Sequence, residues 1–384
     1  MTHRIVVIGA GIAGLAAAVG LQRRGHAVTI LEERADTSSG AGISIWPNAL
    51  AALDHLALGD AVRESGGRVT AGAMRWRDGG WLRRPARGRI VTSLGEPLVV
   101  VRRSILMQVL TDALIPGSIE TGCTAVDLTV TSRGVQVSVA DGSTRDADAV
   151  VGADGVGSVV ARHLNGPLRP HYAGYTAWRG IASHPLDPDL SGETMGSGTE
   201  FGHVPLGPYH TYWFATERGP EGRTSPEGEL AYLRSRYGGW ADPIPTVLAS
   251  TDPADVLRND LYDRDEARVW SRGPVVLVGD AAHPMRPHLG QGGCQGLEDA
   301  AVLAHCVERI PDLGAAFTRF VEARRPRARA LARESKLIGR LVNVRPAALG
   351  ALAVRASSLV PETVLMRHLA TIASGGAFAL PDVS

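Results

Sequence analysis

Lysine, cysteine and aromatic residues are all scarce in this chain of 384 residues, and it has no long apolar run. Lys336 is the only lysine among 40 basic residues, which we attribute to a GC-rich genome rather than to function. Three cysteines, Cys123, Cys294 and Cys306, cannot form a disulfide framework, so we expect a reducing, cytoplasmic location. No stretch reaches the roughly 18 apolar residues of a membrane span, so stable membrane insertion is not expected. The net charge of +1 comes without a basic stripe, which argues against nucleic-acid binding.

A Gly-x-Gly-x-x-Gly turn at Gly9, Gly11 and Gly14 separates an apolar strand from a helix. The following strand ends in Glu32, 18 residues beyond Gly14, which is close to the spacing of a dinucleotide-binding βαβ unit. The first glycine makes the tight turn, the second lets a pyrophosphate approach, and the third lets helix and strand pack closely. Glu32 then binds a ribose, or Glu33 does so if the strand register shifts by one residue. We therefore interpret this apolar stretch as the start of a nucleotide fold rather than as a signal peptide; a turn without a ligand is the alternative.

A second apolar strand, residues 275–278, ends in Gly279-Asp280. The chain continues through Pro287 into Gly290-Gln291-Gly292-Gly293, and a helix is expected from Leu297 onward. A carboxylate at a strand end can hold a polyhydroxy chain, and the amides of a glycine-rich loop can hold the polar edge of a ring. A Gly-Asp pair is also typical of an ordinary turn. The N-terminal glycine motif favours the binding interpretation of Gly279-Asp280, because both segments suit a dinucleotide-type ligand.

The remaining segments predict sheets inserted between the two motifs. Residues 69–101 have the pattern of short strands with breaks. The alternation of apolar and polar residues over 124–151 predicts an antiparallel meander. Residues 169–217 are strand-like and hold most of the aromatic residues, which fits a core sheet and a substrate wall equally. Beyond Leu297 we expect helices that break at Pro326, Pro346 and Pro361.

Three motifs, Gly9-x-Gly11-x-x-Gly14, Asp154-Gly155 and Gly279-Asp280, occur in order, and Pro287 and Gly290-Gln291-Gly292 follow the last one. Together they resemble the single-component FAD-dependent aromatic hydroxylases, the group related to p-hydroxybenzoate and salicylate hydroxylases. The match covers most of the chain to about residue 310. Residues 40–48 and 172–175 are most similar to the branch that contains FAD-dependent urate hydroxylase.

The resemblance implies an α/β fold with a Rossmann-like FAD-binding domain, an inserted antiparallel-sheet substrate domain and a helical C-terminal region. The implied FAD-binding domain is discontinuous and comprises residues 1–68, 102–168 and 265–330. The implied substrate-binding domain comprises residues 69–101 and 169–264, and the C-terminal helices comprise residues 331–384.

The family's chemistry implies FAD as the bound cofactor and NADPH or NADH as a transient co-substrate. Reduced flavin and O2 form a C4a-hydroperoxyflavin, which transfers one oxygen atom to an aromatic or polycyclic small molecule. The protein supplies position, a dry pocket and help with protons. No metal is required, and the sequence contains no H-x-x-x-H or C-x-x-C pattern. A monomer or a homodimer is expected.

By resemblance, Asp280 holds the ribityl chain, Asp154 has a double role near FAD and NAD(P)H, and Arg103 contacts the flavin. A solvated surface arginine at position 103 is the alternative that the sequence leaves open. The expected cofactor-binding residues are Gly9, Gly11, Ala13, Gly14, Glu32, Glu33, Ser44, Arg103, Val126, Asp154, Asp280, Pro287, Gly290, Gln291, Gly292 and Gly293.

Two positions depart from the urate-hydroxylase branch, so urate is a doubtful substrate. His288 stands where that branch has an aspartate, and Glu200 or Phe201 replaces an arginine. Because the unperturbed pKa of histidine lies near neutrality, His288 can act as a general base toward a phenol or an indole N–H, with Tyr212 as the other proton acceptor. A packing role for His288 is the alternative. The expected substrate-contacting residues are Tyr175, Trp178, Arg179 and Met285.

Two other functions remain open. A flavoprotein epoxidase or reductase that acts on an isolated double bond can use the same fold. A non-catalytic protein that binds a prenyl group or a partner can do so as well.

Overall fold

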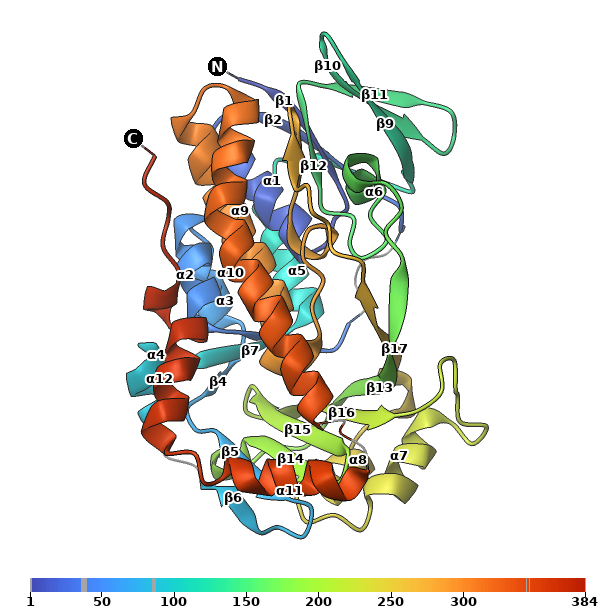
Figure 1. The fold of residues 1–384 in the computed structure, drawn as a ribbon, viewed down its shortest axis with the longest axis vertical. Helices are drawn as coiled ribbons and strands as arrows, with labels where there is room; N and C mark the ends of the chain where they lie inside the picture. Colours follow the sequence, from blue (N-terminus) through green and yellow to red (C-terminus); the bar gives the residue numbers. More distant parts are fainter. Residues whose placement is uncertain (1, 36–39, 85–87, 343, 345, 384) are drawn as a thin grey trace.

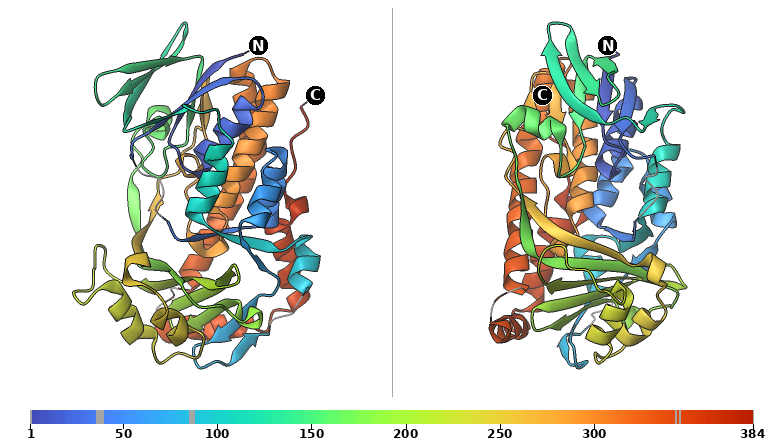
Figure 2. Two further views of the ribbon diagram at one scale, coloured as in Figure 1. Left: turned by 180° about the vertical axis from the view of Figure 1, so that it is seen from behind. Right: turned by 90° about the vertical axis from the view of Figure 1, so that its right-hand side faces the viewer.

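The computed structural model describes residues 2–35, 40–84, 88–342, 344 and 346–383. A helix-covered parallel sheet occupies one end of the molecule, and a mostly antiparallel sheet, in which only β14 (Gly192–Gly196) and β5 (Ala73–Trp76) pair parallel among the described strands, occupies the other (Figures 1 and 2). Both termini lie at the end with the parallel sheet (Figure 1). This arrangement, with helices at the C-terminal end of the chain, confirms the predicted fold class.

The parallel sheet has the strand order β18-β19-β12-β1-β2-β8, and β18 joins it antiparallel. Ile5 and Val7 belong to the core on one face, whereas Val6 and Ile8 belong to the core on the other. Side chains alternate along a strand, so an unbroken apolar run is what a sheet covered on both faces requires. The strands are β1 (Arg4–Ile8), β2 (Ala27–Glu32), β8 (Ile119–Thr121), β12 (Ala149–Gly152), β18 (Ser271–Arg272) and β19 (Val275–Leu277).

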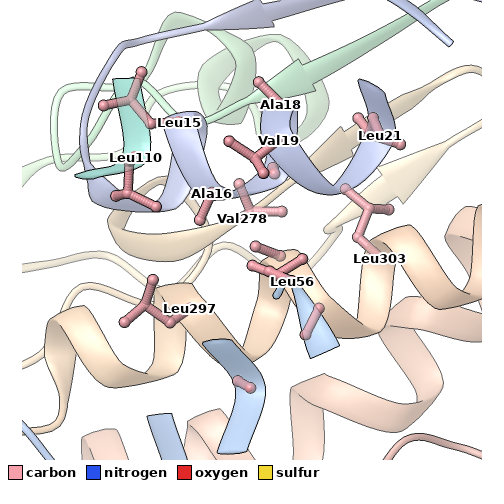
Figure 3. Close-up of a cluster of buried hydrophobic side chains, with 14 of the residues drawn as sticks. Leu15, Ala16, Ala18, Val19, Leu21, Leu56, Leu110, Val278, Leu297 and Leu303 are labelled. Carbon is pink, nitrogen blue, oxygen red and sulfur yellow. The ribbon is translucent and has the colours of Figure 1, made fainter. Parts of the chain in front are cut away.

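Helices pack on one face of this sheet around α1 (Ile12–Gln22), which is buried from Gly14 to Leu21. Figure 3 shows its leucines facing Leu110 of α5 and Leu303 of α9. A helix of alanine, valine and leucine has no polar face, so it must be covered on all sides. The neighbouring helices are α2 (Pro47–His55), α3 (Gly59–Glu64), α5 (Arg103–Asp112), α9 (Gly292–Arg309) and α10 (Leu313–Val342).

The predicted strand at residues 147–151 is largely β12 of the parallel sheet, but an antiparallel meander does lie on the opposite face, as predicted. It consists of β9 (Ala125–Thr131), β10 (Gly134–Val139) and β11 (Thr144–Ala147), which pair antiparallel. Leu128 and Val137 of the meander share a core with Val6 of β1 and with Val160 of α6 (Val159–Asn165). The meander therefore covers the face of the parallel sheet that the long helices leave free.

The second large sheet has the order β17-β13-β16-β15-β14-β5-β6, with helices α7 and α8 covering one face. Of residues 69–101, which the resemblance assigns to the substrate-binding domain, strands β5 and β6 join this sheet, whereas β7 pairs with β3 and β4 in a separate sheet. The elements are β3 (Gly42–Ile45), β4 (Gly67–Val69), β5 (Ala73–Trp76), β6 (Trp81–Arg83), β7 (Leu98–Arg102), β13 (Pro170–Ala182), β14 (Gly192–Gly196), β15 (Thr199–Leu206), β16 (His210–Arg218), β17 (Leu257–Arg264), α7 (Glu229–Tyr237) and α8 (Ile244–Ala249).

Two predicted helix boundaries were wrong. Helix α9 begins at Gly292 rather than at Leu297, so most of the predicted glycine loop is its first turn. Helix α10 continues through Pro326, because the buried residues Phe320 and Ala328 on either side hold it against the core. The breaks at Pro346 and Pro361 are confirmed, since each caps the next helix. The other helical segments are α4 (Arg89–Leu94), α11 (Ala347–Ser357), α12 (Glu362–Ala373), η1 (Pro188–Leu190), η2 (Pro253–Asp255) and η5 (Gly375–Ala377).

Within the described residues, no single helix is long and apolar enough to cross a membrane. Residues Ala348–Ser357 and Glu362–Ala373 meet the length and composition test when they are counted together, and they are bent by 94° relative to each other.

A buried charged network joins α9 to α10. Glu298 and Asp299 are fully buried, and the guanidinium of Arg324 donates to both carboxylates. Arg327 and Asn48 also donate to Glu298, the latter at 2.6 Å. Desolvation raises the pKa of Asp299, but contacts with His283 and Arg324 outweigh it and lower that pKa to about 2. The carboxylate therefore stays ionised at neutral pH and depends on its partners.

Replacing Arg324 with methionine should be strongly destabilising, because it leaves two buried carboxylates without their shared cation. We expect a loss of roughly 3–5 kcal/mol in the free energy of unfolding, measured by urea denaturation. Arg319→Met is the matched control on the same helix. Arg319 pairs with Glu322 at 3.6 Å on the surface, so the control should change stability by less than about 1 kcal/mol. Equal losses in the two variants would contradict the role of the network.

Candidate active site

The glycine turn after β1 forms a cradle that is open on one side. Gly9 has φ +102°, and a Cβ on it would lie 2.5 Å from the carbonyl oxygen of Ala153. A Cβ on Gly14 would lie 2.0 Å from the carbonyl oxygen of Gly9, so helix and strand meet there without room for a side chain. A Cβ on Gly11 would meet no atom within 4 Å. The backbone is therefore compact beneath the turn and accessible at Gly11, where a phosphate can approach.

The carboxylate of Glu32 is fixed at the end of β2. The amide of Ala10 donates to its Oε2 at 2.7 Å, and the amide of Arg34 donates to its Oε1 at 2.9 Å. Glu33 is exposed and lies 3.9 Å from the guanidinium of Arg34. The register therefore favours Glu32 over Glu33 as the ribose acceptor. Val126 of β9 is 49% exposed, an apolar side chain that is free to cover a ring.

Asp280 lies in η3 (Gly279–Ala281), directly after β19, and is exposed. Desolvation raises the pKa of its carboxyl group, and nearby His283, Arg264 and Arg103 lower it. The Gly279-Asp280 turn is anchored to the buried network, because Asp299 accepts hydrogen bonds from the amide of Gly279 at 2.8 Å and from His283 at 2.6 Å. The buried network thus fixes the position of an exposed carboxylate.

The first turn of α9 points its amides toward the same region. Pro287 opens η4 (Pro287–Leu289), and Gly290 follows with φ +61°. Gln291 is the N-cap residue, but its buried side chain bonds to Asn48 and caps no amide. An uncapped helix of 18 residues presents free amides and a partial positive charge to a ligand.

Small residues bring these segments together. A Cβ on Gly279 would lie 2.7 Å from that of Ala13, and one on Gly293 would lie 2.9 Å from Ile43 Cδ1. Ala13 therefore packs α1 against η3. The carbonyl of Ser44 accepts a hydrogen bond from the Cys294 thiol at 3.5 Å, which ties β3 to α9.

The indole N–H of Trp46 is buried with no hydrogen-bond partner among the described residues. It lies 2.9 Å from the place that a Cβ on Gly290 would take. Met285 lies nearby, with its Cγ 3.7 Å from the corresponding place on Gly292. A buried donor without a partner needs an explanation, and a ligand beside this loop supplies one.

Asp154 makes contacts within its own loop. Its carboxylate accepts from the hydroxyl of Ser158 and from the amide of Val159 at 2.7 Å, at the start of α6. These bonds position the turn beside the open cradle. The expected contacts with FAD and NAD(P)H stay a prediction.

Between the cradle and the second sheet lies a buried polar cluster. The Nε2 atom of His288 lies 2.8 Å from the hydroxyl of Tyr175, and its Nδ1 atom lies 3.3 Å from Glu200 Oε1. Phe201 belongs to the core on the other face, so Glu200 is the residue that faces His288. The side chain of His288 is only 1% exposed. Its Nε2 atom is paired with Tyr175, whereas its Nδ1 atom is buried beside Glu200 without a hydrogen-bond partner among the described residues.

Two expected site residues are placed differently. Trp178 lies on the far face of the sheet, where it packs with α7 and its indole N–H donates to Glu229 at 2.7 Å. Tyr212 is buried beneath β3, and a Cβ on Gly42 would lie 2.5 Å from its ring. Arg179 is half-buried on the same face as Tyr175 and donates to Asn259 at 3.2 Å. Because Trp178 lies on the opposite face of the sheet from Tyr175 and Arg179, it does not line this site.

Several residues of the site were not anticipated. Asp299 lies within α9, six residues beyond Gly293, and no local pattern marks it, and Glu193 and Phe214 are single residues on strands. Desolvation, followed by the neighbouring charge of Glu200, raises the pKa of Glu193 to about 7, although His288 lowers it. Alternate residues of a strand face the same side of a sheet, so these residues could have been assigned to the site only if the pairing of the strands had been known.

Comparison with known proteins identifies the ligand that this site fits. The protein family described as "FAD binding domain" matches residues 2–334. The chain belongs to the FAD-dependent aromatic hydroxylases. It is 36% identical to aurachin C monooxygenase/isomerase of Stigmatella aurantiaca over 340 residues, which are 88% of this chain and 89% of that protein. It is 31% identical to FAD-dependent urate hydroxylase of Mycolicibacterium vanbaalenii, over 85% of each chain.

The fold is also similar to that of a solved hydroxylase. HpxO of Klebsiella pneumoniae, complexed with FAD and uric acid, superposes with a TM-score of 0.89 at 27% identity over 96% of both chains. The predicted family and cofactor are therefore confirmed. This flavoprotein is an FAD-dependent monooxygenase, and the alternative of a non-catalytic binding protein has no support.

The residues present fit FAD. The accessible backbone at Gly11 and the fixed carboxylate of Glu32 suit a pyrophosphate and a ribose. The exposed carboxylate of Asp280 suits the hydroxyls of a ribityl chain. The uncapped start of α9 and the unpaired indole N–H of Trp46 suit the polar edge of a flavin ring. The contacts predicted for individual residues stay predictions.

Gly11→Val should abolish FAD binding, because the new side chain fills the accessible side of the cradle. Gly239→Val is the matched control, since a Cβ there also meets no atom within 4 Å but lies far along the chain from the motif. Flavin absorbance after purification measures the result. Glu32→Ala removes the ribose contacts and the two backbone hydrogen bonds of the carboxylate but leaves the cradle open, so it should reduce loading less than Gly11→Val. A fully loaded Gly11→Val protein would show that the turn has no ligand.

Asp280→Ala should leave a folded protein that binds FAD more weakly. A hydrogen bond to a charged group contributes roughly 1.5–3 kcal/mol, which corresponds to about 10- to 150-fold in Kd. Flavin fluorescence titration of the apoprotein measures the change, and circular dichroism checks the fold. Asp255→Ala, at an exposed position in η2, is the control. An unchanged Kd for Asp280→Ala would remove Asp280 from the binding site.

Proposed function

We propose that this flavoprotein inserts one oxygen atom from O2 into an aromatic or polycyclic small molecule, with NADPH or NADH as the reductant. The bound FAD supplies the chemistry, because it accepts electrons from the reduced nicotinamide and activates O2. The protein contributes binding, orientation, exclusion of water and the handling of protons.

One observation carries the proposal. Helix α9, whose first turn fits the flavin edge, is preceded at once by η4, and η4 places His288 against Tyr175 and Glu200 of the antiparallel sheet. His288 therefore links the two parts of the site, because it belongs to the segment before the cofactor loop and contacts the substrate sheet. Any ring bound on this face of the sheet lies close to the loop assigned to the flavin.

The cluster suits proton transfer away from a substrate. The Nε2 atom of His288 is paired with the Tyr175 hydroxyl, so a proton reaches it through Tyr175 rather than directly. Arg286 lies over the ring of Tyr175 at 5.4 Å and is itself paired with Asp263 at 2.7 Å. Burial raises the pKa of Tyr175, which keeps its hydroxyl protonated and able to donate and accept. His288 thus acts as part of a relay, in place of the direct base expected from sequence.

Screening aromatic compounds for those that accelerate NAD(P)H oxidation tests the proposal. Product analysis with 18O-labelled O2 should then show one labelled oxygen on the ring. Label in an epoxide at an isolated double bond would identify the epoxidase alternative instead. Absence of labelled product with every compound that accelerates NAD(P)H oxidation would contradict oxygen transfer to an aromatic ring.

His288→Gln should retain FAD but uncouple the reaction. NAD(P)H would be consumed and hydrogen peroxide released, and formation of the hydroxylated product should fall roughly 10²-fold, the lower end for acid–base help. Tyr175→Phe should give the same phenotype, because it removes the hydroxyl that His288 contacts. His171→Gln is the control, since that histidine pairs with Asp265 on the surface. Unchanged coupling in His288→Gln would leave His288 with a packing role.

A further inference from the structure

One row of side chains crosses four strands of the antiparallel sheet on the face toward the cofactor. The strand register places Arg179 of β13 opposite Phe214 of β16, Phe214 opposite Gly202 of β15, and Gly202 opposite Glu193 of β14. Residues directly opposite in antiparallel strands project to the same face. Arg179 lies four residues beyond Tyr175 on β13, so the row shares the face of the His288 cluster.

This row is more accessible than the next one. Arg179, Phe214 and Glu193 are each half-buried, and Gly202 has no side chain to cover. The adjacent row toward His288 is buried at every position, namely Ala177, Thr216, Glu200 and Met195. The accessible row is thus a strip bordered by packed residues.

The middle of the strip is an aromatic surface. A Cβ on Gly202 would lie 2.1 Å from the ring of Phe214, so the phenyl ring lies over the glycine. Any larger residue at position 202 would displace that ring. A flat phenyl group resting on a glycine offers its face to a second aromatic ring by offset stacking.

The two ends of the strip carry opposite charges. Arg179 and Glu193 stand three strands apart, which is about 14 Å between backbones and leaves room for an aromatic ring between them. Arg179 donates to Asn259, and its charge acts on Tyr212. The charges of Glu200 and His288 act on Glu193. Among the described residues, no cation forms an ion pair with the Glu193 carboxylate. The acid therefore has acceptor capacity left for a ligand.

We propose that the substrate is an uncharged aromatic compound that stacks on Phe214, donates an O–H or N–H from one edge to Glu193, and accepts a hydrogen bond on the opposite edge from Arg179. This inference rests on the proposed function, since it names the substrate class for the same site. Aromatic compounds with a carboxylate at both edges are excluded by repulsion from Glu193.

The donor edge also gives Glu193 a chemical role. When the substrate O–H or N–H bond breaks, the proton passes to the Glu193 carboxylate and the electron pair stays on the heteroatom. That pair enriches the ring, which is the form that accepts an electrophilic oxygen. With its pKa raised to about 7, Glu193 is ionised above that pH and protonated below it. Affinity for the donor edge should therefore rise with pH through about 7. Desolvation raises this pKa most, the charge of Glu200 raises it further, and His288 lowers it.

Ligand binding to the FAD-loaded, oxidised protein tests the inference without turnover. The probe is 4-hydroxyacetophenone, which has a hydroxyl donor opposite a carbonyl acceptor, and perturbation of the flavin spectrum reports Kd. We expect 4-methoxyacetophenone, which lacks the donor, to bind roughly tenfold or more weakly. Glu193→Gln should remove this preference and the pH dependence, and Arg179→Gln should weaken both probes. Terephthalate, with two carboxylates, should not compete.

Glu217→Gln is the matched control, because Glu217 lies on β16 of the same sheet but faces α7, where it pairs with Arg236. It should keep the parental preference between the two probes. Equal binding of the two probes by the parent protein, binding of neither, or unchanged preference in Glu193→Gln would overturn the proposal.

The outcomes separate this inference from the proposed function. Oxygen transfer to some ring with an unchanged probe preference in Glu193→Gln would leave the monooxygenase function standing and remove the substrate class. Probe discrimination that depends on Glu193, in a protein that transfers no oxygen to any ring, would support the binding site and contradict the function.

Discussion

The buried pairing of Glu298 and Asp299 with Arg324 is the interaction on which the cofactor site depends. Burying an ion pair rarely adds much stability by itself, and removing one partner is severe because the other charge is then left alone. Here the same carboxylate that needs Arg324 also receives the amide of Gly279 and the imidazole of His283. The backbone turn that presents Asp280 is therefore fixed by a charge that cannot relax into water.

This arrangement extends to the start of α9. Asn48 bridges Glu298 and Gln291, so the N-cap side chain of the helix is used inside the protein rather than at the helix end. Because Gln291 bonds to Asn48, its side chain does not cap the amides of the first turn of α9. The network thus prepares an anchored carboxylate and an unsatisfied helix terminus on the same side of the molecule, and both suit one ligand.

Local spacing in the sequence accounts for more of the geometry of the cofactor half of the site than of the substrate half. Gly9, Gly14 and Glu32 lie within one βαβ unit, where local spacing determines geometry. The start of α9 was missed because glycine is a poor helix former, and here tertiary contacts outweigh propensity. Trp178 was assigned to the wrong face because one residue reverses the side of a strand, and the register of β13 shifts between Tyr172 and Thr176. Glu193 and Glu200 meet His288 through strand pairings that no local pattern encodes.

The half-buried strip on the antiparallel sheet has an implication for how such enzymes diversify. Its side chains project from strands whose alternate residues, such as Phe201 and Trp213, build the packed core beneath α7 and α8. In the proposed site, specificity and folding would be carried by interleaved residues of the same strands that face in opposite directions. A lineage can exchange the charges at the ends of the strip while the core keeps its volume, and the glycine turn that forms the FAD cradle is unaffected. Substrate range can therefore drift between relatives whose backbones remain superposable.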